Sequence, residues 1–204
     1  MTNDIKQLTT LLPFTPLSFM EIGSRDGNDT KTIVDFWKID SENCYVIEAY
    51  PTLAKEIKEK YSYNVYSFAA SNINGVAKFN AVVSKHQDRV GMSSLLHHKT
   101  EKNYFNVIDV ETKTMKSFFE ENNLSIDLIK LDVEGHAYSV IEGFGDKIKE
   151  VKAIQIETEK TQQWENQKCH NDVKELLESF NFEMISIFPA WDAQYDCLFI
   201  NKSL

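Results

Sequence analysis

Short apolar runs alternate with amphipathic stretches along almost the whole chain, and this alternation predicts the order of its secondary structure. Apolar runs bounded by turn residues predict strands, and apolar residues recurring at helical spacing predict helices. We expect strands at Leu17–Ile22, Asn43–Glu48, Asn64–Ala69, Leu128–Asp132, Ala153–Glu157, Phe182–Ile187 and Cys197–Asn201. We expect helices at Asp29–Lys38, Pro51–Lys60, Thr114–Glu121, Ala137–Gly145 and Asn171–Phe180.

Strands that alternate with helices are typical of a parallel sheet covered by helices on both faces. The last two expected strands follow each other with no helix between them, so the second should run antiparallel to its neighbours. The pattern therefore predicts an α/β, Rossmann-like fold whose seven-stranded sheet is mostly parallel and has an antiparallel last strand.

The middle of the chain, from Ser71 to Val110, is less regular. Asn74-Gly75 is a strong hairpin-turn signal, and Val76–Val83 is expected to return from it as an extra strand. Another strand-like piece follows at Phe105–Val110. We expect a loop-rich insertion over residues 71–110 beside the functional site, within a single domain that spans residues 1–204.

Composition and charge exclude several classes of protein. The formal net charge of −9 and the pI of about 5.1 argue against a phosphate-binding surface, so nucleic acid is a poor candidate partner. Cys44, Cys169 and Cys197 are far apart, which favours reduced thiols over disulfides or a zinc site. Since no apolar run has the ~20 residues of a membrane span and the start lacks a secretory leader, we expect a cytoplasmic protein without a membrane partner.

The first expected strand runs into a glycine-punctuated turn with the sequence Glu21-Ile22-Gly23-Ser24-Arg25-Asp26-Gly27. Gly23 and Gly27 allow the backbone to turn sharply and to approach a ligand closely. A phosphate favours amides and cations, whereas the carboxylate of Glu21 suits a ligand that carries positive charge, such as the ammonium and sulfonium of S-adenosylmethionine. Such a turn alone is equally typical of a purely structural loop.

Charged residues also stand at the expected carboxyl ends of two further strands. Glu48 ends the second strand, more than about 20 residues after the glycine turn, where an acid binds the two ribose hydroxyls of a nucleoside. In the fourth strand, apolar residues alternate with Lys130, Asp132 and Glu134. Ligands of open parallel sheets bind at this edge, so the pattern favours a functional site over a solvated strand end.

The run IDLIKLDVEGHAYSVIEGF resembles the hallmark segment of FkbM-type methyltransferases. Five further blocks are similar to that family in order and spacing: MEIGSRDGND, VIEAYP, AASNINGVAKF, VETKTMKSFFEEN and AIQIETE. The resemblance implies a class I methyltransferase fold, S-adenosylmethionine as the cofactor and O-methyl transfer to a sugar, glycan or other small molecule. It further implies a cofactor site formed by Glu21, Gly23, Ser24, Gly27, Glu48, Ala70, Ser71 and Asp132.

The chain departs from the family pattern at three places. Aspartate is more usual where Glu21 stands, and an Ala-Asn pair where Ser24-Arg25 stands. A glutamate is usual two residues after the motif glycine, at the position of Ala137. If that acid matters in other members, this chain must use another group or another acceptor.

Methyl transfer to a hydroxyl requires a group that accepts the hydroxyl proton, and Asp132, Glu134 and His136 are the catalytic candidates. We rank His136 first, narrowly, because it begins a helix whose field disfavours imidazolium and leaves a neutral base. Asp132 and Glu157 could bridge a divalent metal, but two carboxylates alone do not support that assignment, and we assign no metal ligands. Further candidates for the acceptor pocket are Arg25, His97, His98, Trp164 and Trp191. Roles in loops or in packing are more common for such residues.

Two other functions remain open. A nicotinamide-dependent oxidoreductase shares the strand, the turn and the acid, but Glu21 would repel a pyrophosphate and the Gly-x-Gly-x-x-Gly pattern is incomplete. A catalytically inactive, cofactor-binding scaffold is the other alternative, and Ala137 is the residue that supports it. A nucleic-acid aminomethyltransferase is disfavoured, because Leu-Asp-Val-Glu-Gly replaces an Asn-Pro-Pro-Tyr-type motif.

Overall fold

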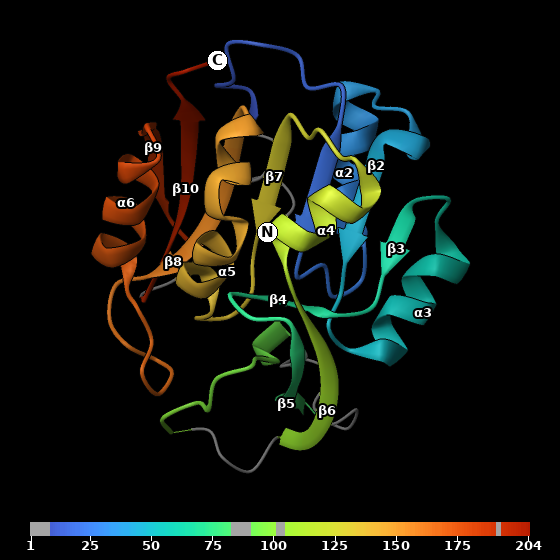
Figure 1. Cartoon of the computed structure of the whole chain (residues 1–204), viewed down its shortest axis with the longest axis vertical. Helices are drawn as coiled ribbons and strands as arrows, with labels where there is room; N and C mark the ends of the chain where they lie inside the picture. The colour runs from blue at the N-terminus through green and yellow to red at the C-terminus, as the bar shows by residue number, and fades with distance from the viewer. Residues whose placement is uncertain (1–8, 83–90, 101–104, 191–192) are drawn as a thin grey trace.

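The computed structural model describes residues 9–82, 91–100, 105–190 and 193–204. Its main sheet has seven strands in the order β3-β2-β1-β7-β8-β10-β9 (Figure 1). The strands are β1 (Phe19–Ile22), β2 (Cys44–Ile47), β3 (Asn64–Tyr66), β7 (Leu128–Leu131), β8 (Ala153–Glu159), β9 (Phe182–Pro189) and β10 (Gln194–Asn201). From β3 to β8 all neighbours pair in parallel, and β10 runs antiparallel to both β8 and β9. The predicted sheet and its antiparallel last strand are therefore confirmed.

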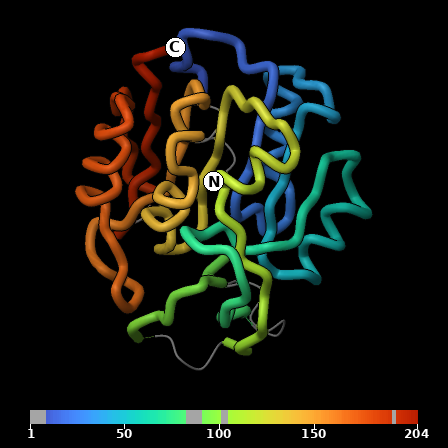
Figure 2. Tube along the Cα trace, in the orientation of Figure 1, coloured from blue at the N-terminus to red at the C-terminus, as the bar shows by residue number. Residues whose placement is uncertain are grey.

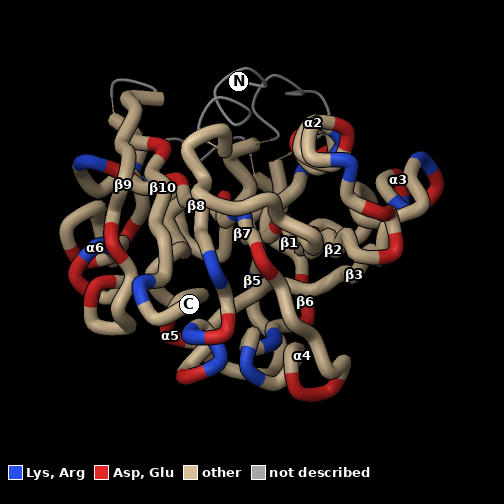
Figure 3. Tube along the Cα trace, turned by 90° about the horizontal axis from the view of Figure 1, so that it is seen from above, with Lys and Arg blue, Asp and Glu red and all other residues tan. Residues whose placement is uncertain are grey.

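Helices cover both faces of this sheet, as the end-on view in Figure 3 shows. One face carries α2 (Asn28–Trp37) and α3 (Pro51–Lys60), and the other carries α4 (Met115–Asn122), α5 (Ala137–Phe144) and α6 (His170–Ser179). Short 3₁₀ turns lie at η1 (Ser41–Asn43) and η3 (Gly145–Glu150). Pro51 occupies the first turn of α3, where its missing N–H costs no hydrogen bond, and the Thr114 side chain caps α4.

Alternation along the strands divides the core into two layers. Met20 and Ile22 of β1 pack with Val140 of α5, whereas Phe19 packs with Ile33 of α2. Glu21 alternates with Met20 and Ile22, so it shares the α2 face with Phe19. A carboxylate at such a buried position needs a partner inside the protein.

A second, three-stranded sheet lies below the carboxyl ends of β1, β2 and β7 in Figure 1. It consists of β4 (Ala69–Ser71), β5 (Gly75–Val82) and β6 (Phe105–Thr114), with β6 in the middle. The two extra strands expected between residues 71 and 110 are thus present, and β6 continues to Thr114. The expected third strand is divided, because β3 ends at Tyr66 and β4 belongs to the second sheet.

The hairpin predicted at Asn74-Gly75 is wrong. β4 and β5 do not pair with each other: β4 pairs with β6 in parallel and β5 pairs with β6 antiparallel. The Asn74 side chain instead fastens the start of α4, accepting a hydrogen bond from the Thr114 N–H at 2.7 Å and donating one to the Ser117 hydroxyl at 3.0 Å.

The segment 91–100 and the loop after β8 lie side by side at the lower end of the molecule (Figure 2). The Lys99 N–H donates to the Gln163 carbonyl at 2.9 Å, and the Glu165 N–H donates to the His97 carbonyl at 2.8 Å. Among the described residues, no helix has the length and apolar character needed to cross a membrane.

Candidate active site

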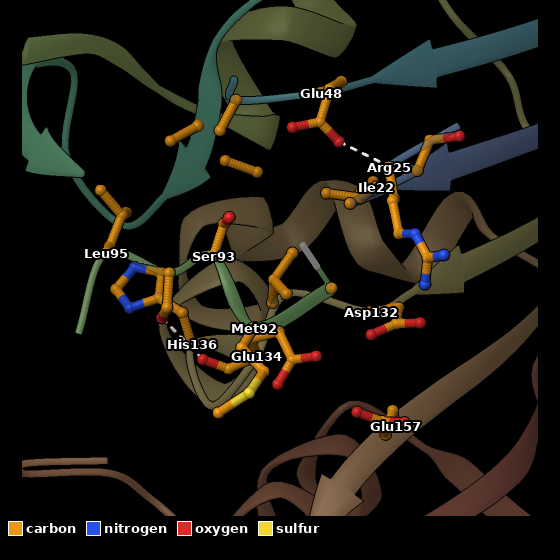
Figure 4. Close-up of a pocket in the computed structure, with 18 of the residues that line it drawn as sticks. Ile22, Arg25, Glu48, Met92, Ser93, Leu95, Asp132, Glu134, His136 and Glu157 are labelled. Atoms are coloured by element: carbon orange, nitrogen blue, oxygen red, sulfur yellow. Dashed lines mark hydrogen bonds between the residues drawn. The ribbon is translucent and has the colours of Figure 1, made fainter. Parts of the chain in front are cut away.

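A cavity of about 580 Å³ lies between the carboxyl edge of the main sheet and the second sheet. The strand order reverses between β1 and β7, and this switch point is where doubly wound sheets bind their ligands. The lining comes from the ends of β1, β2, β7 and β8, from β4 and β5, and from residues 91–95. Figure 4 shows Glu48 at one end of the cavity, with Asp132, Glu134 and Glu157 at the other.

The turn after β1 is held against its neighbouring strands by backbone contacts. The Gly23 N–H donates to the Ile47 carbonyl, and the Asp132 N–H donates to the Ile22 carbonyl, each at 2.9 Å. A Cβ atom at Gly23 would lie 1.8 Å from the Asp132 carbonyl oxygen, so only glycine allows this close approach. The packing of β1 against β7 therefore requires glycine at position 23.

The structure places Glu21 beneath the turn and outside the cavity lining. Its side chain is fully buried, with one carboxylate oxygen 3.0 Å from the Lys130 ammonium. The other oxygen accepts hydrogen bonds from the Ser24 hydroxyl at 2.7 Å and the Thr30 hydroxyl at 2.5 Å. The positive charge that Glu21 faces is thus a lysine of the chain itself, in contrast to the cationic ligand expected from the sequence.

Lys130 connects three elements at the base of the site. Besides Glu21, its ammonium lies 2.9 Å from an Asp29 oxygen of α2 and 3.0 Å from an Asp132 oxygen at the end of β7. Burial alone would lower the pKa of Lys130, but the three carboxylates raise it well above the ordinary value. The lysine therefore remains charged and holds Asp132, which is 26% exposed at its side chain, at the cavity wall. The sequence reasoning missed Asp29, whose only signal is its place in the first turn of a helix.

Glu48 lines the cavity and is positioned by two backbone amides. Its carboxylate oxygens accept hydrogen bonds from the Arg25 and Tyr50 N–H groups, each at 2.8 Å. Burial raises the pKa of Glu48 above its ordinary value, and these two hydrogen bonds oppose the shift. Each oxygen retains a lone pair for a further donor, so the pair of oxygens fits the two hydroxyls of a ribose.

The other residues expected to bind the cofactor divide into two groups. Gly23, Ser24 and Ala70 line the cavity. Gly27 is absent from the lining and packs against the Tyr61 ring at the start of α2. Ser71 is buried outside the lining, with its hydroxyl 3.1 Å from Nε2 of His136.

His136 caps α5 and lines the cavity. Burial lowers the pKa of its imidazole to about 4, so the ring is neutral at neutral pH. The expectation of a neutral histidine agrees with this direction, but the cause is burial and not the helix field.

Three carboxylates gather at the end of the cavity opposite Glu48. Asp132, Glu134 and Glu157 each place a carboxylate oxygen within 4.8 Å of the others, and the Gln194 amide donates to Glu157 at 2.8 Å. Burial, reinforced by neighbouring carboxylates, raises the pKa values of Glu134 and Glu157 well above the ordinary value. A shared proton relieves the repulsion between acids at such distances.

Glu159 is a fourth acid beside this group and was missed in the sequence. Burial raises its pKa to about 7. The signal was present, because strand alternation in AIQIETE puts Glu157 and Glu159 on one face of β8.

The aromatic side chains near these acids are held in place by packing. Trp164 is 1% exposed and lies against Gly135 and edge-on to the His98 ring, whose centroid is 4.9 Å away. This packing leaves Trp164 little free face for stacking with a sugar. His98 lines the cavity, whereas His97 does not. Trp191, the other tryptophan considered for the acceptor pocket, is outside the described residues.

Comparisons with solved structures agree with this class of fold. A protein of the NADB-Rossmann superfamily from Streptococcus agalactiae matches with a TM-score of 0.55 and 15% identity over 98% of this chain and 68% of that one. The FkbM methyltransferase from Methylobacillus flagellatus matches with a TM-score of 0.59 and 14% identity over 94% of this chain and 45% of that one. Fibrillarin from Aeropyrum pernix, with natively bound S-adenosylmethionine, matches with a TM-score of 0.55 and 9% identity over 97% of this chain and 74% of that one.

These likenesses show a Rossmann-like α/β fold, with the cavity at the switch point of its sheet. The family model described as the methyltransferase FkbM domain matches residues 21–184, and the chain therefore belongs to this family of S-adenosylmethionine-dependent methyltransferases. The chain spans less than half the length of the Methylobacillus enzyme. No curated relative matches the sequence.

Proposed function

We propose that the chain methylates a hydroxyl group of a small-molecule or glycan acceptor, with S-adenosylmethionine as the donor. The observation that supports this is the combination, in one cavity, of a ribose-type acid with carboxylates of raised pKa. Glu48 suits the nucleoside end of the cofactor. The acids at the ends of β7 and β8 suit the acceptor end, where a proton is released.

When bound, S-adenosylmethionine supplies an activated methyl group whose transfer breaks a C–S bond and forms a C–O bond. The chain must align the acceptor and take up the hydroxyl proton. A carboxylate whose pKa is raised accepts that proton more readily than an ordinary carboxylate and returns it to water before the next cycle. We therefore propose Glu134 as the base, with the proton shared with Glu157, whose pKa is also raised.

His136 is less suited to this role in the folded protein. A base whose pKa is about 4 is weak at neutral pH, and its Nε2 atom already faces the Ser71 hydroxyl. The ring is better placed as a neutral wall of the acceptor pocket.

Calorimetric titration with S-adenosylmethionine, S-adenosylhomocysteine and NAD tests the cofactor. We expect the first two to bind and the Glu48→Ala variant to bind both at least about tenfold more weakly, because a hydrogen bond to a charged group contributes about 1.5–3 kcal/mol. Glu42→Ala is the matched control, since Glu42 is exposed outside the cavity on the segment before β2. Binding of NAD alone would point to the oxidoreductase alternative.

The acceptor is tested with a panel of sugars and other polyols, each compared with a derivative whose hydroxyls are blocked. We expect methyl transfer only to acceptors with a free hydroxyl, detected as a mass increase of one methyl group. Cofactor binding without transfer to any member of the panel would support the scaffold alternative instead.

A further inference from the structure

Acidic side chains outnumber cationic ones in the described lining of the cavity. Its acidic lining residues are Asp26, Asp29, Glu48, Asp132, Glu134 and Glu157. Among the lining residues that the structure describes, the cations are Arg25 and Lys130, and Lys130 is engaged by three carboxylates. Among the described residues, no ion pair or side-chain hydrogen bond involves the Arg25 guanidinium; its charge acts on Glu134, where it opposes the rise in pKa, and its N–H donors remain available to a ligand.

The turn after β1 aims this guanidinium at the cavity. Arg25 has a φ of 58°, a left-handed conformation that is uncommon for residues other than glycine. Its N–H donates to Glu48, which holds the backbone in that conformation at the ribose end. A Cβ atom at Gly91 would lie 3.6 Å from an Arg25 guanidinium nitrogen and 3.9 Å from a Glu134 oxygen, so the charged group reaches towards the acceptor end. Figure 4 shows the side chain extending from the Glu48 end towards Asp132.

The methionine part of the cofactor carries an ammonium, a sulfonium and one carboxylate. The acids of the cavity attract the two cationic groups but repel the carboxylate, which needs a cation nearby. A guanidinium offers a planar fork of donors that matches a carboxylate. We propose that Arg25 binds the methionine carboxylate of S-adenosylmethionine and thereby selects the complete cofactor over forms that lack this group. The inference rests on the cofactor assigned above.

The test compares S-adenosylmethionine with its decarboxylated form, which keeps the ammonium, the sulfonium and the nucleoside. We expect the wild-type protein to bind the complete cofactor about tenfold to a hundredfold more tightly. Arg25→Met should bind the two ligands with nearly equal affinity, because only the complete cofactor loses a contact. Arg25→Lys, which keeps the charge but lacks the fork, should show an intermediate preference.

Four other outcomes would overturn the inference. Equal weakening of both ligands in Arg25→Met would show that the arginine only shapes the turn. Unchanged cofactor affinity with a raised KM for the acceptor would assign Arg25 to the acceptor. A wild-type protein that binds neither ligand would overturn the cofactor assignment and this inference with it, whereas binding without preference would overturn this inference alone.

Discussion

Replacing Lys130 with methionine is expected to lower the free energy of unfolding by about 3–5 kcal/mol, because it leaves buried carboxylates without their counter-ion. The ammonium that is lost lies 2.9–3.0 Å from oxygens of Glu21, Asp29 and Asp132, and the lysine side chain is 5% exposed. Urea unfolding followed by circular dichroism at neutral pH measures the loss.

Glu21→Gln provides the control for this effect. Combined with Lys130→Met, it removes the most deeply buried negative charge while keeping a side chain that Ser24 and Thr30 can still contact. The double variant should therefore be more stable than Lys130→Met alone. A loss below about 1 kcal/mol in the single variant would contradict the prediction and would show that water reaches the carboxylates.

The pH dependence of this variant follows from the directions of the pKa shifts. In the wild type, the raised pKa of Lys130 means that its contribution is complete below the ordinary pKa of lysine and is lost only in strongly alkaline solution. Burial already raises the pKa of Glu21, and without Lys130 this shift should grow. A carboxylate with a raised pKa favours the folded state at low pH, so the destabilisation of Lys130→Met should shrink on acidification.

Local patterns in the sequence were sufficient to predict most of the fold. The alternation of strands and helices predicted the main sheet. Each strand buries one face and each helix one stripe, so the spacing of apolar residues distinguishes the two kinds of element. The position of Glu48 at a strand end predicted that it would lie at the carboxyl edge of the sheet, and it lines the cavity there. These features depend on residues close together in the chain or on rules common to all open parallel sheets.

The features that escaped prediction depend on which side chains meet across the fold. Glu21 was expected to face a ligand, but strand register sets it opposite Lys130 of β7, 109 positions away. Asn74 was expected to form a hairpin turn, but its side chain forms hydrogen bonds with Thr114 and Ser117 at the start of α4. Ser71 was expected to contact the cofactor, but its hydroxyl faces His136. The reason is the close approach of α5 to β4: a Cβ atom at Gly143 would lie 2.0 Å from the Ser71 carbonyl oxygen.

These contacts suggest why the lysine, the aspartate and the glutamate of the hallmark segment occur together. Lys130 fixes Asp132 at the end of β7, and the backbone then turns at Glu134, which has a φ of 48°. The turn brings the Glu134 carboxylate to Asp132 and to Glu157 of β8. The motif thus has two parts. Lys130 is buried and stabilises the base of the site, whereas Asp132 and Glu134 line the cavity together with Glu157.

Replacing Glu134 with glutamine is expected to lower kcat by about 10²–10⁴-fold, because the variant cannot take up the hydroxyl proton. Burial and neighbouring acids raise the pKa of Glu134, so in the wild type kcat should rise with pH as the group of acids loses its shared proton. In Glu134→Gln the remaining activity should lose most of this dependence. Steady-state kinetics across the neutral range, with the acceptor found by the panel, measure both effects.

Glu175→Gln is the matched control, since Glu175 is exposed on α6 and outside the cavity lining, and it should retain wild-type kcat and pH profile. Cofactor affinity in Glu134→Gln should remain within about threefold of wild type, because the proposed role is in proton transfer and not in binding. His136→Gln separates the two candidate bases. If it removed activity and the pH dependence while Glu134→Gln kept both, the proton would pass to the imidazole. We expect the reverse, since a ring whose pKa is about 4 is already deprotonated across the neutral range and cannot produce the rise in rate.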